Sequence, residues 1–140
     1  MDLERAMAFV RPGTKAVLTT LRADGRPQLS NVVYAVADDG SIRVSVTERR
    51  AKTVNMRRDP RVCLHVTDES FWQYVVLDGE ARLGPVTRDV GDPGSDMLVD
   101  YYRRVNGEHP DWDDYRRAMV EEGRLVAVVT PTRAYGQLQT

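Results

Sequence analysis

Apolar and polar residues alternate with a period of two along several short segments of the chain. In residues 41–47, Ile42, Val44 and Val46 fall on one side of an extended backbone, and the polar residues between them fall on the other. Residues 61–67 alternate in the same way. This period is typical of β-strands that bury one face, so both segments are predicted to be strands.

Turn-forming residues separate further segments that favour β-structure. Asp24-Gly25 joins two segments rich in Val, Thr and Leu and predicts a tight hairpin. The predicted strands cover residues 14–22, 26–36, 41–47, 61–67, 71–77 with a continuation at 80–83, and 125–130. Because most of them follow one another through tight turns, the sheet is expected to be antiparallel, and a closed or nearly closed barrel would leave no unpaired edges.

Helical patterns occupy the intervals between these strands. The predicted helices cover residues 1–10, 49–58, 95–106 and 110–122. Asp59-Pro60 ends the second of them, and Ser95 is placed to cap the third. The chain is therefore expected to form one domain over residues 1–140, mainly β with peripheral helices.

Composition and charge limit the classes of function. The chain carries 20 Lys and Arg residues against 21 Asp and Glu, a formal net charge of −1, which argues against a nucleic-acid partner. No apolar run approaches the ~20 residues of a membrane-spanning helix, and the N-terminus lacks a signal-peptide pattern. The single cysteine, Cys63, suits a reducing compartment. A cytoplasmic protein without membrane or nucleic-acid partners is expected.

Residues 49–61 form the strongest local signal for a ligand site. Six basic residues stand there against one acid, at the start of a predicted helix that directly follows a strand. Backbone N–H groups and the helix dipole favour an anion at such a place, and Arg50 and Lys52 would add charge-assisted hydrogen bonds. A solvated charged helix face explains the same residues equally well.

Two strands carry side chains that a simple barrel does not require. Gln28, Ser30 and Asn31 are able to hydrogen-bond a planar heterocycle, or they form an ordinary solvent-exposed face. Residues 71–77 are apolar on both faces, with Trp72, Tyr74 and Val76 on one and Phe71, Val75 and Leu77 on the other. Since only one face can reach a small core, the other is expected to meet a partner or a ligand, unless loops or the late helices cover it.

The residue sets of common hydrolases and metalloenzymes are missing. Cys63 and His65 share a strand face, but no third group nearby in sequence would orient them, so packing is the simpler interpretation. Neither a metal-ligand spacing nor a phosphate-binding glycine motif is present. No metal site is predicted, and no catalytic residue is assigned.

The order of several segments resembles a known family. DGRPQLSNVVY, then IRVSVT, then RRAKTVNMRRDPRV and FWQYVVLDGEARL look like the pyridoxamine-phosphate-oxidase-like split β-barrel proteins. The chain is closer still to their deazaflavin-dependent branch, which uses coenzyme F420 in actinobacteria, and GEHPDWDDYRRAM resembles that same branch. The resemblance runs from about Thr14 to Gly136. A basic content that is almost entirely arginine agrees with a GC-rich actinobacterial genome.

The resemblance implies a split β-barrel of the FMN-binding kind, working as a homodimer with the cofactor between its subunits. It implies that Arg50 and Lys52 bind the cofactor phosphate, with Ser45 and Thr47 beside it. Gln28, Ser30 and Asn31 are then expected near the ring or the ribityl chain. Trp72 and Tyr74 of the partner subunit are expected to cover the site. Surplus arginines such as Arg57 and Arg58 would suit the acidic oligoglutamate tail of F420.

The implied function is hydride transfer from reduced coenzyme F420 to an electron-poor small molecule, such as an enone, a quinone or a nitro compound. An FMN-binding oxidase or reductase on the same barrel stays open, as does a non-catalytic flavin or deazaflavin carrier. True pyridoxamine phosphate oxidases bind their substrate partly with an Arg-x-His element near the C-terminus. This chain has Arg133 but no histidine after His109, which argues against pyridoxal phosphate synthesis.

Overall fold

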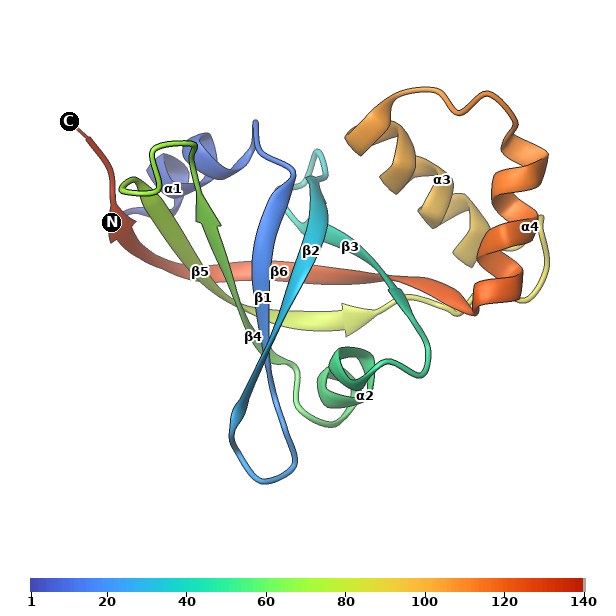
Figure 1. Cartoon of the computed structure of the whole chain (residues 1–140), viewed down its shortest axis with the longest axis horizontal. Coiled ribbons are helices and arrows are strands. Elements are labelled where there is room, and N and C mark those ends of the chain that lie inside the picture. Colours follow the sequence, from blue (N-terminus) through green and yellow to red (C-terminus); the bar gives the residue numbers. More distant parts are fainter. Residues whose placement is uncertain (140) are drawn as a thin grey trace.

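The computed structural model of the chain describes residues 1–139 and forms a closed barrel of six strands with helices outside it (Figure 1). The strands are β1 (Lys15–Leu21), β2 (Pro27–Val36), β3 (Ile42–Thr47), β4 (Arg61–Thr67), β5 (Tyr74–Leu83) and β6 (Arg124–Gln137). Around the barrel they follow the order β1-β2-β3-β6-β5-β4, and each neighbouring pair is antiparallel. The predicted antiparallel barrel with peripheral helices is confirmed.

The interior of the barrel holds the main hydrophobic core. Ile42, Val44 and Val46 on β3 point inward and are at most 1% exposed, which confirms the alternation of that segment. Leu64 on β4 and Leu125 on β6 are fully buried in the same cluster. Because burial of one such side chain stabilises the fold by ~1.5–3 kcal/mol, the alternation decides which face of each strand turns inward.

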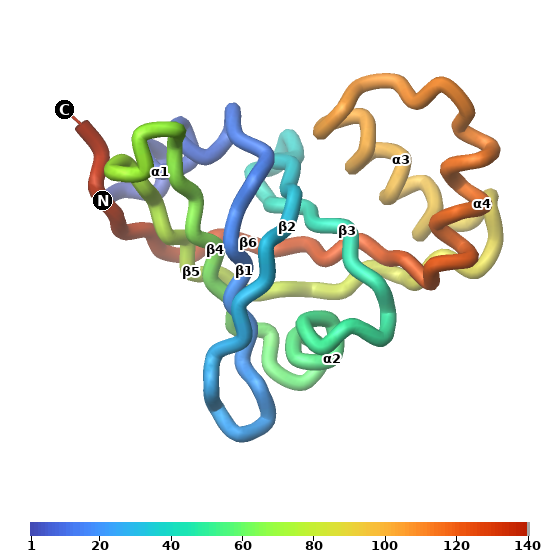
Figure 2. Tube along the Cα trace, viewed as in Figure 1, coloured from blue at the N-terminus to red at the C-terminus, as the bar shows by residue number. Residues whose placement is uncertain are grey.

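The helices cover the barrel at its ends and on one side. They are α1 (Leu3–Val10), α2 (Ala51–Arg58), α3 (Pro93–Asn106) and α4 (Trp112–Glu122). At one end, the backbone oxygen of Val10 on α1 accepts a hydrogen bond from the hydroxyl of Tyr34. α3 and α4 pack against each other and the outer side of β6 through an apolar cluster that includes Leu98, Tyr115 and Val126 (Figures 1 and 2). Within residues 1–139, no helix has the length and apolar character needed to cross a membrane.

The predicted aromatic strand starts later than expected. β5 begins at Tyr74, and Phe71 and Trp72 lie in the preceding turn, so the prediction that Trp72 and Tyr74 share a strand face is wrong. The carboxylate of Asp68 organises this turn and accepts hydrogen bonds from the backbone N–H and the hydroxyl of Ser70, at 3.0 and 2.6 Å. An acid that binds nearby backbone N–H groups favours a turn over a strand.

The start of α3 also differs from its prediction. The cap is Asp92, not Ser95, because the Asp92 carboxylate accepts a hydrogen bond from the Ser95 backbone N–H at 2.8 Å. Pro93 then occupies the first turn, where a missing N–H donor has no cost. The helix therefore begins two residues before the predicted range.

β6 is the largest departure from the predicted strands. It continues past the predicted end at Thr130 as far as Gln137, and its second half pairs with the first half of β5. Pro131 lies opposite Gly79, at an irregularity in the register between Asp78 and Gly79. Proline is tolerated in a sheet at such a bulge, which is why the strand passes through it.

β2 and β3 separate soon after the turn that joins them. They pair only from Val36↔Ile42 to Tyr34↔Val44, and below that point the strands diverge, with α2 in the widening gap (Figure 1). The Thr53 hydroxyl donates to the backbone oxygen of Thr47 on β3 at 2.7 Å. Asn55 donates to the Gln28 side chain on β2 at 3.1 Å. α2 thus bridges the split, and the site described next lies at the mouth of this split.

Candidate functional site

The split between β2 and β3 opens into a hollow of about 340 Å³ that α3 and α4 partly cover. Its walls are made by Asn31, Val32, Val33, Ser45, Lys52, Tyr101, Tyr102, Tyr115, Met119 and Arg124. A second, polar hollow of about 560 Å³ shares Arg124 with the first and includes Thr47, Arg49, Arg50 and Arg88. We call the two hollows together the split site. Five predicted cofactor-binding residues line it: Asn31, Ser45, Thr47, Arg50 and Lys52.

Three cationic side chains converge at the split site. Burial lowers the pKa of Lys52, and the positive charges of Arg50 and Arg124 lower it further. Arg124 is paired with Glu122 at 3.0 Å, whereas neither Arg50 nor Lys52 forms an ion pair within residues 1–139. Glu48, Glu121 and Glu122 also line the second hollow, and Glu48 pairs with Arg88. A bound anion would stabilise the two cations that have no acidic partner, so Arg50 and Lys52 favour an anionic ligand here.

The start of α2 adds donors to the same place. Arg50 is the N-cap residue and provides no side-chain cap hydrogen bond. The backbone N–H groups of Ala51 and Lys52 have no hydrogen-bond partner in the part of the chain that the structure describes. Free N–H groups and the positive end of the helix dipole both attract an anion such as a phosphate.

An aromatic wall from α3 and α4 faces these cations. Tyr102 and Tyr115 meet edge to face, with their ring centroids 5.0 Å apart. The Tyr115 hydroxyl donates to the backbone oxygen of Leu98 at 3.0 Å, and burial raises its pKa to about 12. Tyr101 and Met119 complete the wall. A wall of packed rings offers a planar ligand a preformed apolar surface.

Gln28 and Ser30 lie outside both hollows of the split site. The side-chain oxygen of Gln28 accepts from Asn55 at 3.1 Å, and the same Asn55 nitrogen also donates to the Thr20 hydroxyl. Gln28 therefore helps to hold α2 in the split. Arg58 is engaged too, since it donates to the backbone oxygen of Leu21 at 2.7 Å.

Trp72 and Tyr74 lie on a different part of the surface, and neither lines the split site of its own chain. Trp72 is 72% exposed and packs edge to face on Phe71, which has a positive φ of 71°. Tyr74 stacks on His65, with their centroids 5.3 Å apart. The predicted contact of both residues with the partner's cofactor stays a prediction.

Sequence reasoning missed Arg124 and the tyrosines of the split site. Arg124 is the first residue of β6, one position before the predicted strand, and pairs in register with Thr47 of β3. Tyr101 and Tyr115 fall within the predicted helices 95–106 and 110–122, on the apolar stripe of each helix, and no ligand role was predicted for them. A stripe with several tyrosines was the available signal, since a phenol hydroxyl needs a polar partner that an aliphatic side chain does not.

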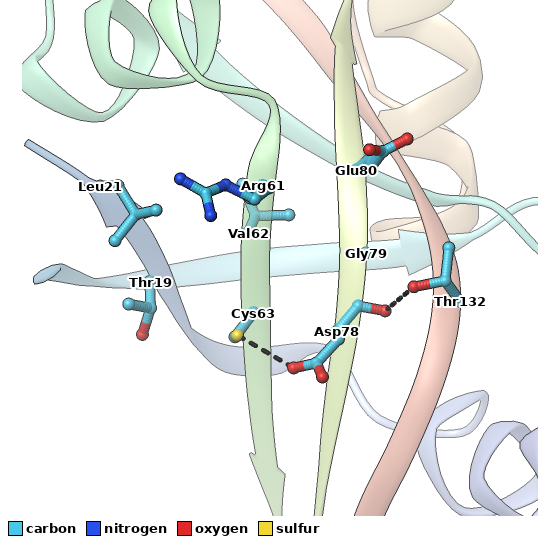
Figure 3. A pocket seen from close by; sticks show the side chains of 9 residues that line it. All are labelled: Thr19, Leu21, Arg61, Val62, Cys63, Asp78, Gly79, Glu80 and Thr132. Atoms are coloured by element: carbon cyan, nitrogen blue, oxygen red, sulfur yellow. Dashed lines mark hydrogen bonds between the residues drawn. The ribbon is translucent and has the colours of Figure 1, made fainter. Parts of the chain in front are cut away.

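A further hollow of about 510 Å³ lies on the outer wall formed by β1, β4, β5 and β6, and contains Cys63 (Figure 3). The thiol donates to the Asp78 carboxylate at 3.2 Å. Burial raises the pKa of Cys63 to about 11, and the hydrogen bond and charge of Asp78 add to the effect. The thiol is therefore protonated near neutral pH and is a poor nucleophile. Cys63 and His65 do not form a catalytic pair.

The acidic, histidine and cysteine side chains of residues 1–139 do not gather into a group of three or more able to hold a metal ion. The ligand chemistry of the split site is instead that of cations, backbone donors and aromatic rings. Such a set suits an anionic, planar, organic ligand better than a metal ion.

Comparison with known proteins gives one family and one fold. Residues 3–137 match the family described as pyridoxamine 5'-phosphate oxidase. Among solved structures, a conserved hypothetical protein from Mycobacterium tuberculosis is 25% identical, with a TM-score of 0.73, covering 97% of this chain and 84% of that one. An F420 reductase is 24% identical, with a TM-score of 0.65 and coverage of 96% and 97%. A FAD-binding protein from Mesorhizobium loti shares the fold at 16% identity, with a TM-score of 0.68 and coverage of 97% and 92%.

Proposed function

The chain belongs to the pyridoxamine 5'-phosphate oxidase family, and from that premise we propose that it is an oxidoreductase that uses reduced coenzyme F420. Its substrate would be an electron-poor small molecule such as an enone, a quinone or a nitro compound. The observation that carries this proposal is the meeting of two unpaired cations, Arg50 and Lys52, with a tyrosine-lined hollow at the mouth of the split.

The cationic half of the split site fits the phosphate of the cofactor. Arg50, Lys52 and Arg124 would contribute charge, and the free N–H groups at the start of α2 would contribute directed hydrogen bonds. The hydroxyls of Ser45 and Thr47 lie on the same side of β3 and line the two hollows. They would accept or donate further hydrogen bonds to phosphate oxygens.

The aromatic half fits a planar ring. Tyr101, Tyr102 and Tyr115 would form one side of a ring-binding slot, with Asn31 at its edge as a hydrogen-bonding side chain. When bound, the cofactor supplies the hydride, while the side chains bind and orient it and keep water away. No side chain is assigned as the proton donor.

A homodimer with the site at the subunit interface is part of the proposal. Phe71 and Trp72 are held on an organised turn and are 64% and 72% exposed, and Tyr135 on β6 is 52% exposed. Large apolar groups gathered in this way mark an interaction surface. In the proposed dimer, Trp72 and Tyr74 of the partner subunit would close the open side of the split site.

The choice of a deazaflavin over FMN has its own support. The segment that resembles the F420-dependent branch, residues 107–119, contributes Tyr115 and Met119 to the hollow, so part of that segment would lie beside the ring. An F420 reductase shares the fold, but at 24% identity this likeness supports the fold alone. A FAD-binding protein shares it as well.

The test is a pair of fluorescence titrations, with coenzyme F420 and with FMN, followed by a reductase assay. We expect tighter binding of F420 and loss of the reduced-cofactor absorbance when an enone, quinone or nitro acceptor is added. Equal or tighter binding of FMN would favour the FMN-dependent oxidase or reductase. Binding of reduced F420 without reduction of any acceptor would favour a carrier.

A further inference from the structure

The hydrogen-bonded ladder between β2 and β3 stops at Tyr34↔Val44, although both strands continue beyond this pair. Its last pair is Tyr34↔Val44, so Val33 and Ser45 are next in register but do not pair with each other. In an antiparallel ladder, alternate residues turn their N–H and C=O groups toward the neighbouring strand. The N–H of Tyr34 donates to Thr14, on the β1 side of β2. The neighbouring Val33 therefore turns its carbonyl toward β3, the strand that it has left.

The hydroxyl of Tyr101 takes the place of the missing ladder bond. It donates to the backbone oxygen of Val33 at 2.8 Å, and the backbone N–H of Ser45 is near enough to the same hydroxyl to oppose the rise in its pKa. A phenol hydroxyl can donate and accept at once, so one atom can join both strands. The group stays protonated, because burial raises the pKa of Tyr101 above its usual value.

The helix that carries Tyr101 is fixed on both sides of this residue. Arg104 binds Asp38, in the turn between β2 and β3, at 3.0 Å and Asp100 on its own helix at 2.8 Å. Leu98, one turn before Tyr101, is fully buried in the cluster that rests on β6. The Tyr101 hydroxyl is therefore held between the strands by a rigid support, and it prevents them from pairing further.

We propose that Tyr101 is a positioning residue whose hydroxyl is a strut between β2 and β3, setting the distance between Asn31 on one strand and Ser45 on the other. Both residues line the mouth of the split site: Ser45 is the residue of β3 next to the strut, and Asn31 lies two residues from Val33 on β2. Without the hydroxyl, water would enter between the two strands, and the ligand would meet a site of different width. The proposal rests on the proposed function only in that the ligand held there is the cofactor.

The chain provides a matched control for the strut. Tyr101→Phe keeps the ring and removes one oxygen. Tyr102→Phe makes the same change on the next residue of α3, where the hydroxyl has no hydrogen-bond partner within residues 1–139. In the ligand-free protein, we expect the Ser45 amide of Tyr101→Phe to exchange with solvent deuterium about fivefold faster than in the parent, since a net hydrogen bond of about 1 kcal/mol is lost. Tyr102→Phe should leave this rate unchanged.

A second measurement separates positioning from general stability. Tyr34→Phe removes a hydrogen bond to Val10 at one end of the barrel, outside both hollows of the split site, and should lower the melting temperature at least as much as Tyr101→Phe. Only Tyr101→Phe should weaken cofactor binding, by about fivefold if the binding free energy falls by about 1 kcal/mol. Equal affinity losses in Tyr101→Phe and Tyr34→Phe would overturn the proposal, because they would show an effect of stability alone.

The outcomes for the strut and for the proposed function are distinguishable. An unchanged Ser45 exchange rate in Tyr101→Phe overturns the strut, whatever the parent protein binds. Faster exchange with unchanged cofactor affinity overturns it as well, since the strands would then be held without effect on the site. If the parent binds neither F420 nor FMN, the proposed function fails, and the Ser45 exchange rate alone decides whether Tyr101 holds the strands.

Discussion

The two outer walls of the barrel differ in how far their apolar side chains are covered. Where α3 and α4 pack on β6, the apolar residues of the outer face are covered, and Val126 and Val128 are only 1% and 5% exposed. On the wall that β1, β4 and β5 form, together with the turn before β5, Phe71 and Trp72 are 64% and 72% exposed. The same chain thus buries apolar side chains on one wall and presents larger ones to solvent on the other.

The difference suggests separate roles for the two walls, ligand binding for one and subunit contact for the other. The covered wall borders the split site, where Arg50 and Lys52 have no acidic partner within residues 1–139 and packed tyrosines line an open hollow. The uncovered wall has apolar surface and no cover of its own. In the proposed homodimer, the exposed aromatic residues of one subunit would close the open side of its partner's split site. The same contact would bury these aromatic residues away from water. Four predictions, each with its control, test this comparison.

Trp72→Asp has the largest expected effect, on the uncovered wall. Burying an aromatic side chain contributes ~1.5–3 kcal/mol, and two-fold symmetry counts the loss twice. At about 1.4 kcal/mol per factor of ten, the dissociation constant of the dimer should rise by about 10²- to 10⁴-fold. Sedimentation equilibrium with the cofactor present measures it.

Val90→Asp is the control for this change, since Val90 is a 44% exposed apolar residue in the loop before α3, away from the uncovered wall. Its substitution should leave the dimer intact. A parent protein that is monomeric at micromolar concentration, with cofactor bound, would contradict the proposed dimer.

The thiol of Cys63 reports on the same wall without disturbing it. With a pKa of about 11 in the fold, against ~8.5 for an ordinary thiol, Cys63 should react with iodoacetamide at pH 8 about a hundredfold more slowly than free cysteine. Asp78→Asn should recover part of the rate, because burial remains while the negative charge goes. A parent thiol that reacts as fast as free cysteine would show that this wall opens readily in solution.

The sequence was sufficient to predict the barrel, because its signal is local. The alternation around Val44 decides the inward face of β3 without reference to any other strand. The second half of β6 could not be found in this way, since Pro131 argues against a strand and only the bulge opposite Gly79 accommodates it. The bulge depends on a partner strand, which no local pattern contains.

The residues of the split site also divide into those that local sequence could predict and those that only the fold brings together. Arg50 and Lys52 could be proposed as anion-binding residues because they lie in one basic run at a helix start. Arg124 joins them only because β3 and β6 pair with Thr47 opposite Arg124, and Tyr101 joins only because α3 folds back over the split. The side chains that adapt the site to a ring therefore come from contacts between distant segments, which composition and spacing do not encode.

Lys52→Ala tests the ligand side of the comparison. If Lys52 binds the phosphate, its loss removes a charge-assisted hydrogen bond of roughly 1.5–3 kcal/mol and weakens cofactor binding by roughly ten- to a hundredfold. Arg50→Ala should act similarly. The ligand-free protein should be no less stable, because burial and the neighbouring arginines already disfavour the Lys52 charge. Titration and thermal melting of each variant measure the two effects.

Arg61→Ala is the matched control for Lys52→Ala, since it removes a cation from the same basic run. Arg61 is 72% exposed at its side chain and binds Asp59 at 2.8 Å, away from both hollows of the split site. Its loss should leave cofactor affinity nearly unchanged. Weaker binding by Arg61→Ala but not by Lys52→Ala would show that the phosphate is bound elsewhere.

The smallest expected effect compares the barrel with its helical cover through two buried tyrosines. Burial raises the pKa of Tyr34, inside the barrel, and of Tyr115, inside the cover, to about 12 each. Both folded values lie above the ordinary ~10, so the folded protein holds these protons more tightly. Their contribution to stability is complete below pH 10 and is lost as the pH rises toward 12, by about 1 kcal/mol per tyrosine at pH 11. Urea unfolding at pH 9, 10 and 11 should therefore show that the free energy of unfolding falls less with rising pH in Tyr34→Phe and in Tyr115→Phe than in the parent.

If the cover opens independently of the barrel, only Tyr34→Phe will change how the free energy of global unfolding falls with pH, because Tyr115 will already have ionised in the opened cover. Curves that stay parallel to the parent for both variants would show that neither ring is sealed from water as the structure indicates.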